Sequence, residues 1–88
     1  MALIEISPEG ESVFSVRVEG RTFVVTAAET LVTALGAPDP VSLVRGSFEF
    51  LLDREPAGAI LPRFDLSVIE RYFPEWPEEM RRRWRSPT

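Results

Sequence analysis

The chain has 88 residues, a hydrophobic fraction of 44% and a formal net charge of −4. These values are typical of one small acidic globular domain and disfavour attraction to the phosphates of nucleic acid. The chain contains no histidine, cysteine or lysine, which excludes the usual zinc, iron and copper ligands and any nucleophilic pair that relies on histidine. We therefore expect no enzyme, no metal and no other cofactor.

The ends and the length of the chain give three further expectations. The N-terminus has no basic segment followed by a long apolar one, so we predict no signal peptide and a cytoplasmic location. No apolar run approaches the roughly 20 residues of a membrane helix, so no membrane contact is expected. A single domain over 1–88 is near the lower size limit for a self-sufficient core, and a homodimer is predicted to bury further apolar surface.

Alternating apolar residues predict a β-meander over 3–26. A first strand is expected over 3–6, closed by a turn over 7–10. A hairpin follows over 13–26, with Glu19-Gly20 as its two-residue turn. With that turn, one register places five apolar side chains of both strands on the same face. These side chains are Phe14, Val16, Val18, Phe23 and Val25.

Capping patterns mark the first two helices. Thr26 and Glu29 have the spacing of a capping box, for a helix that ends at Gly36. Asp39-Pro40 places an N-cap before a proline at the first helical position. A second helix is therefore expected from this point to about Arg54.

The last third of the chain predicts a connector and two more helices. The connector over 57–64 contains a short helical turn, and Asp65 is expected to cap a helix over 66–73. Pro74 and Pro77 separate this helix from a final one that ends near Arg85.

Together these elements predict an α+β fold. A small antiparallel β-hairpin or three-stranded meander over 3–26 is followed by three to four short helices packed on one face. The helical layer spans 27–73, and a Pro/Trp/Arg-rich C-terminal helix occupies 74–88.

The second predicted helix carries apolar residues on two adjacent faces, which exceed the roughly 100° stripe of a helix packed on one side. Such a helix is either central in its own domain or shared with a partner subunit. Gly46 costs roughly 1 kcal/mol relative to alanine in a helix. We therefore expect either that another backbone approaches closely at this position or that the helix simply tolerates the cost. The residues assigned to a homodimer contact are Leu43, Gly46, Ser47 and Phe50.

The C-terminal helix carries Trp76, Met80 and Trp84 on one edge, among four arginines. This pattern predicts either a docking helix for an acidic partner, a membrane surface or nucleic acid, or packing of the tryptophans on the domain itself. The aromatic residues and prolines over 64–76 are likewise typical of a partner-binding surface or of a tail tied to a small core. The residues assigned to an unidentified protein partner are Tyr72, Trp76, Met80, Arg81 and Trp84.

Residues 21–52 resemble the ribbon-helix-helix DNA-binding proteins. The likeness consists of a strand over 21–26, a short helix, a turn after Gly36, and a second helix that contains Leu43-Val44-Arg45 and residues 48–52. The resemblance implies an obligate dimer that reads DNA through a paired strand.

Arg21, Thr22 and Val24 would then stand at the base-reading positions, and the protein would be a DNA-binding regulator or an antitoxin. However, the strand already has a hairpin partner, and the chain is acidic. The favoured function is therefore a small non-catalytic, dimerising module for protein–protein interaction, with DNA binding as the alternative.

Overall fold

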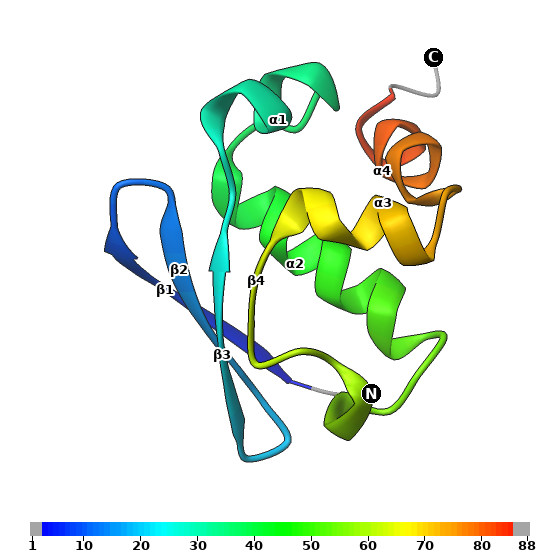
Figure 1. The fold of residues 1–88 in the computed structure, drawn as a ribbon. Helices are drawn as coiled ribbons and strands as arrows, with labels where there is room; N and C mark the ends of the chain where they lie inside the picture. Colours follow the sequence, from blue (N-terminus) through cyan, green and yellow to red (C-terminus); the bar gives the residue numbers. More distant parts are fainter. Residues whose placement is uncertain (1–2, 86–88) are drawn as a thin grey trace.

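The sheet contains four strands in the order β1-β2-β3-β4, in a computed structural model that describes residues 3–85. The predicted meander is formed by β1 (Ile4–Gly10), β2 (Val13–Val18) and β3 (Arg21–Thr26), which pair antiparallel. The helices cover one face of this sheet (Figure 1). The predicted α+β class, a meander followed by helices on one face, is therefore confirmed.

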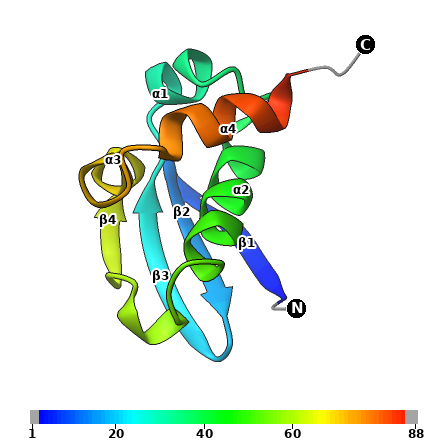
Figure 2. The same cartoon turned by 90° about the vertical axis from the view of Figure 1, so that its right-hand side faces the viewer.

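A fourth strand, β4 (Arg63–Asp65), was not predicted. It pairs parallel with β3, and the four strands lie side by side (Figure 2). The carbonyl of Pro62 accepts a hydrogen bond from the Val24 amide at 2.9 Å. The segment expected to be a connector is therefore fixed to the sheet.

The hairpin of β2 and β3 has the predicted register. Val18 pairs with Arg21 across the turn, and the pairing continues without a register shift to Val13 and Thr26. Glu19 and Gly20 have φ angles of 51° and 78°, the left-handed conformation that a tight hairpin turn needs at both central positions. The five apolar residues predicted on one face are all buried.

β1 is longer than predicted, and the turn expected over 7–10 is wrong. Ser7 and Pro8 continue the pairing with β2, and the chain turns only after Gly10. In the β2–β3 hairpin, hydrogen-bonded and non-hydrogen-bonded pairs alternate from the tight turn between the two strands. A β2 residue that forms its backbone hydrogen bonds with β3 forms none with β1, and this alternation places Pro8 in a non-hydrogen-bonded pair with β2. The missing N–H of Pro8 therefore faces the open edge of the sheet, where a proline is tolerated.

The first helix, α1 (Glu29–Ala34), begins later than the capping box predicts. Thr26 is not the cap because it belongs to β3, and the N-cap residue Ala28 makes no side-chain hydrogen bond. Sheet pairing therefore overrides the local capping pattern. The predicted end of the helix is correct, since Gly36 has a φ of 74°, the left-handed conformation common after helix C-termini.

The second helix, α2 (Pro40–Leu52), starts as predicted and ends two residues before Arg54. The carboxylate of Asp39 accepts a hydrogen bond from the Ser42 amide at 2.7 Å, so Asp39 is the N-cap. Seven residues of α2 are buried, on more than one face. They are Leu43, Val44, Gly46, Ser47, Phe48, Phe50 and Leu51.

The remaining elements are short. A 3-10 turn η1 (Ala57–Ala59) precedes β4, and η2 (Leu66–Val68) leads into α3 (Ile69–Tyr72) and then α4 (Trp76–Trp84). Asp65 caps the start of η2 as predicted, because its carboxylate accepts a hydrogen bond from the Ser67 amide at 2.9 Å. Residues 86–88 of the predicted tail lie outside the described residues.

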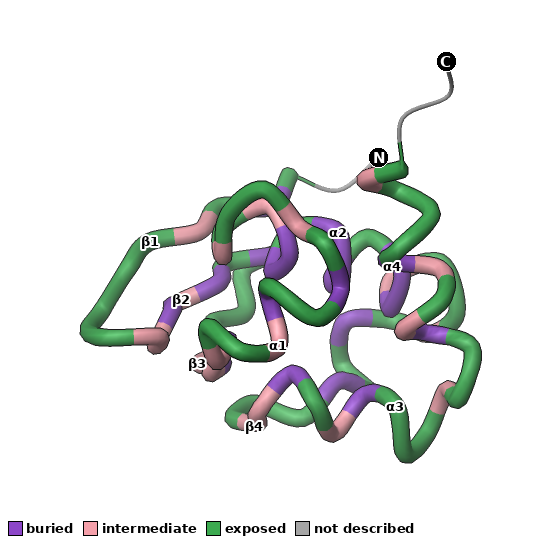
Figure 3. The backbone as a smooth tube through the Cα atoms, turned by 90° about the horizontal axis from the view of Figure 1, so that it is seen from above, coloured by how far each residue is buried: buried purple, intermediate pink, exposed green. Residues whose placement is uncertain are grey.

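One hydrophobic core joins the sheet to the helices. Phe48 of α2 lies at its centre, with its ring centroid 5.3 Å from that of Phe23 and 6.1 Å from that of Phe64. Burial is extensive in α2 and alternates along β2 (Figure 3). Within residues 3–85, no helix is long and apolar enough to cross a membrane.

Candidate functional site

α4 is docked on α2 through a buried, hydrogen-bonded contact. Trp76 and Met80 of α4 are 0% and 1% exposed. The indole Nε1 of Trp76 donates to the hydroxyl of Ser47 at 3.2 Å, and that hydroxyl donates to the Met80 sulfur at 3.9 Å. Because Ser47 is itself fully buried, this chain of bonds satisfies polar groups that would otherwise be costly inside the core.

The atoms nearest to Gly46 belong to side chains of α4 in the same chain, not to another backbone as one of the two expectations had it. A Cβ at this position would lie 3.1 Å from Cδ of Arg83 and 3.5 Å from the Met80 sulfur. The four residues assigned to a dimer contact are all buried in the fold of a single chain. They are Leu43, Gly46, Ser47 and Phe50, and in this structure they offer no surface to a second copy.

The residues assigned to partner binding fall into two groups. Trp76 and Met80 are buried and Trp84 is partly buried against the core, so the structure shows the packing alternative for this helix. Arg81 is exposed and lies 3.8 Å from Glu78. Tyr72 is 67% exposed and lies on α3, away from the buried edge of α4.

The other arginines of α4 also have acidic neighbours. Arg82 lies 3.5 Å from Glu79 on the same helix. Arg83 reaches across to α2, where its guanidinium lies 2.9 Å from the Glu49 carboxylate. These ion pairs reduce the basic character that the sequence of this helix indicates.

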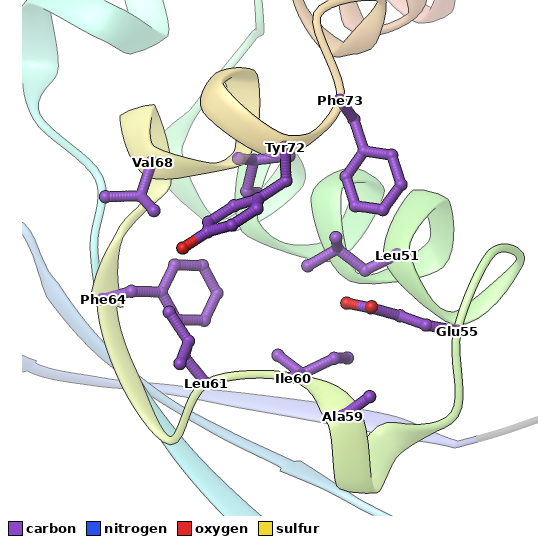
Figure 4. A pocket seen from close by; sticks show the side chains of 10 residues that line it. Leu51, Glu55, Ala59, Ile60, Leu61, Phe64, Val68, Tyr72 and Phe73 are labelled. Atoms are coloured by element: carbon purple, nitrogen blue, oxygen red, sulfur yellow. The ribbon is translucent and has the colours of Figure 1, made fainter.

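A cavity of about 400 Å³ opens between the C-terminal end of α2 and α3. Figure 4 shows the side chains that surround it. They are Leu51, Glu55, Ala59, Ile60, Leu61, Phe64, Val68, Ile69, Tyr72 and Phe73. We call this site the α2–α3 pocket.

The α2–α3 pocket has a buried floor and an exposed apolar rim. Leu51, Ile60 and Ile69 are buried, whereas Leu61 is 48% exposed and Tyr72 is 67% exposed. These two are among four large hydrophobic residues that are exposed in the described part of the chain. Exposed apolar surface therefore gathers at the mouth of a cavity, an arrangement typical of binding sites.

The pocket holds two polar side-chain groups, the hydroxyl of Tyr72 and the carboxylate of Glu55. Figure 4 shows the carboxylate directed into the space between the apolar side chains. Neither group makes a hydrogen bond or ion pair with a residue of the described chain. The pocket can therefore accept an apolar group and offers one acidic group to a ligand.

Arg54, the neighbour of Glu55 in the sequence, is occupied elsewhere. Its guanidinium lies 3.6 Å from the centre of the Phe50 ring and donates to the Phe50 carbonyl at 3.2 Å. Its Nε lies 3.6 Å from the carboxylate of Glu75. Arg54 is also not among the residues that line the pocket, so it does not neutralise Glu55 there.

The stretch over 64–76, expected to be a partner-binding surface or a tail tied to the core, supplies Phe64, Tyr72 and Phe73 to the pocket wall, whereas Glu55 and residues 59–61 were assigned to no site. The signal for the missed part was the apolar run Ala59-Ile60-Leu61 in a segment assigned to a connector. Three successive apolar residues are unexpected in a connector, because connectors run over the surface and bury little apolar area. One of them, Ile60, is buried under the pocket, whereas Leu61 stays on its rim.

The strand order differs from a ribbon-helix-helix arrangement. β3, the strand that the resemblance assigns to DNA reading, lies between β2 and β4 and is paired on both edges. Because β4 covers the second edge of β3 over Val24–Thr26, at most residues 21–23 are left to pair across a dimer. In addition, no group of three or more acidic side chains in residues 3–85 is arranged to hold a metal ion.

Comparisons of the chain with protein-family models, with curated proteins and with solved structures find no match. The chemistry of the molecule's own surfaces is therefore the basis for assigning a function.

Proposed function

We propose that this protein is a non-catalytic protein–protein interaction module that binds an apolar segment of a partner in the α2–α3 pocket. The observation that carries the proposal is the position of Leu61 and Tyr72, two exposed apolar residues on the rim of a cavity with an apolar floor. Aromatic and aliphatic residues around a preformed depression are the usual anchors of protein interfaces.

The shape of the site favours a protein segment as its ligand. The apolar surface continues from the cavity onto the exposed faces of Leu61 and Tyr72. A ligand that covers both the cavity and its rim buries more apolar area than one that fills the cavity alone. A segment with one anchoring side chain and flanking residues meets this requirement.

The cytoplasmic location and the homodimer stay predictions. If two copies associate, Leu61 and Tyr72 at the pocket offer exposed apolar surface, whereas the residues first assigned to a dimer contact are buried. A second copy and a different protein would then compete for the same site.

The test is selection of binding peptides from a random 12-residue display library on the immobilised full chain. Affinities of the selected peptides are then measured by fluorescence polarisation for the wild type and for Leu61→Asp. We expect Leu61→Asp to weaken binding at least tenfold, since it places a charge on the apolar rim. The matched control is Leu3→Asp, because Leu3 is also exposed and does not line the pocket.

Two results would overturn the proposal. The first is a set of peptides that bind Leu61→Asp as tightly as the wild type. The second is a failure to enrich any peptide that the wild type binds in preference to Leu61→Asp.

A further inference from the structure

Glu55 gives the pocket a chemical preference beyond its apolar character. The residue lies three positions after the end of α2, and its amide donates to the Leu51 carbonyl at 2.9 Å. This bond holds the backbone of Glu55 beside the cavity, while the carboxylate points inward (Figure 4). The acidic group is thus part of the site, on a backbone that is held in place.

We propose that the partner segment carries a lysine or arginine side chain next to its apolar anchor, and that Glu55 pairs with it. This inference rests on the proposed function of the pocket. Docking of any segment removes water from the half-buried Glu55 carboxylate. An unpaired carboxylate in an apolar contact is costly, whereas a cation with good geometry offsets that cost.

The surroundings of Glu55 add to the negative potential. The C-terminal end of a helix carries partial negative charge, and α2 has no basic residue in its last turn. Arg54, just beyond that turn, offsets part of this charge at the Phe50 carbonyl. Its guanidinium is engaged there, on the Phe50 ring and near Glu75, and forms no hydrogen bond or ion pair with the Glu55 carboxylate in the described residues. The net charge of −4 acts in the same direction.

Tyr72 provides a second group suited to a cation. Its ring is largely exposed on the rim of the same pocket that holds Glu55. An arginine or lysine side chain that reaches Glu55 can pack its alkyl stem or its charged group on this ring. A neutral apolar segment gains the apolar contact but leaves Glu55 unpaired, and an acidic segment is repelled.

The basic segment belongs to a different protein rather than to a second copy of this chain. Two copies of this chain each carry a net charge of −4 and therefore repel one another. The arginines of α4 also have acidic neighbours, as with Arg82 and Glu79 or Arg83 and Glu49. A different protein with a basic surface is instead attracted to this acidic chain.

The experiment uses the fluorescein-labelled 12-residue peptides selected on the wild-type chain, with each basic residue beside the apolar anchor also replaced by glutamine or glutamate. Affinities are compared for the wild type, Glu55→Gln and Glu55→Lys. The matched control is Glu9→Lys, which makes the same change in net charge on the exposed strand β1, away from the pocket. Circular dichroism of each variant checks that it is folded.

We expect the selected peptides to be enriched in lysine or arginine beside a large apolar residue. Glu55→Gln should weaken their binding about tenfold, as for loss of a charged hydrogen bond. Glu55→Lys should weaken it further and should favour the glutamate-substituted peptides. Glu9→Lys should change affinity less than about twofold at physiological salt, where the screening length is about 8 Å.

The results separate this inference from the function on which it rests. Peptides that lack a basic bias and bind Glu55→Lys normally, yet lose binding to Leu61→Asp, overturn the cation preference and leave the interaction module intact. Binding that neither Glu55→Lys nor Leu61→Asp weakens overturns both the cation preference and the proposed interaction module. A wild-type dimer that Leu61→Asp dissociates, seen by light scattering, makes a second copy the occupant and overturns the assignment of a different partner.

Discussion

The contact between α2 and α4 and the pocket between α2 and α3 are both rich in aromatic and apolar residues, but only the first is closed. At the α2–α4 contact, the small residues Gly46 and Ser47 let α4 approach until Trp76 is fully buried. At the pocket, Tyr72 remains 67% exposed beside a cavity. Aromatic density alone therefore does not separate a closed contact from a candidate binding surface; the apolar area left uncovered separates them.

The largest expected effect comes from Trp76→Ala. Trp76 is fully buried and its indole donates to Ser47, so truncation leaves a cavity and should lower the free energy of unfolding by about 3–5 kcal/mol. Tyr72→Ala, at the exposed rim of the α2–α3 pocket, should lower the free energy of unfolding by less than about 1 kcal/mol. Urea unfolding followed by circular dichroism measures both, and equal costs would contradict the contrast between the two regions.

Gly46 tests how closely the two helices approach. Gly46→Leu should cost about 1–3 kcal/mol in unfolding free energy, because the added atoms meet Arg83 and Met80. Gly46→Ala should be close to neutral, since the gain in helix propensity of up to about 1 kcal/mol offsets a contact with the flexible end of Arg83. Thermal and urea unfolding would show this order; a Leu variant as stable as the Ala variant would mean that α4 is not packed there.

Ser47→Ala isolates the hydrogen bond at the centre of the closed contact. The substitution leaves the buried indole N–H of Trp76 without its acceptor, so we expect a loss of about 1–2 kcal/mol. Ser42→Ala in the same helix is the control and should change unfolding free energy by less than about 0.5 kcal/mol. If the two variants unfold at the same urea concentration, the Trp76–Ser47 bond contributes nothing to stability.

The smallest effect is expected at the rim of the closed contact. Glu49 and Arg83 are 2.9 Å apart, but their side chains are 45% and 39% exposed. Solvent screening therefore limits the contribution of this ion pair, and Glu49→Gln should cost at most about 0.5 kcal/mol. Urea unfolding at low and high salt checks this, and a loss above about 1.5 kcal/mol would show that the pair is more than a surface contact.

Short sequence patterns correctly predicted the elements whose conformation depends mainly on neighbouring residues in the chain. The two-residue turn at Glu19-Gly20 and strict alternation on both strands left one possible register for the hairpin. Asp39 before Pro40 likewise marked the start of α2. In contrast, Thr26 and Glu29 matched a capping box, but Thr26 was held in β3 by pairing with neighbouring strands.

The missed elements depend on contacts between distant segments. β4 has three residues, which is too short to show alternation, and its parallel pairing with β3 joins segments about 40 residues apart. For α4, the spacing of Trp76, Met80 and Trp84 predicted an apolar edge but not the surface it covers. The stretch over 64–76 pointed to one side of the α2–α3 pocket, but the cavity itself was not predicted, because α2, η1, β4 and α3 each supply only part of its wall.

Binding in the α2–α3 pocket is tested most directly by a nuclear magnetic resonance titration of the ¹⁵N-labelled chain with a selected basic, apolar peptide. We predict shifts at the amides of residues that line the α2–α3 pocket, including Glu55, Leu61 and Tyr72, and little change at Trp76 and Met80. Shifts concentrated on α4, with the pocket amides unchanged, would contradict the account and assign binding to the helix that the structure shows as closed.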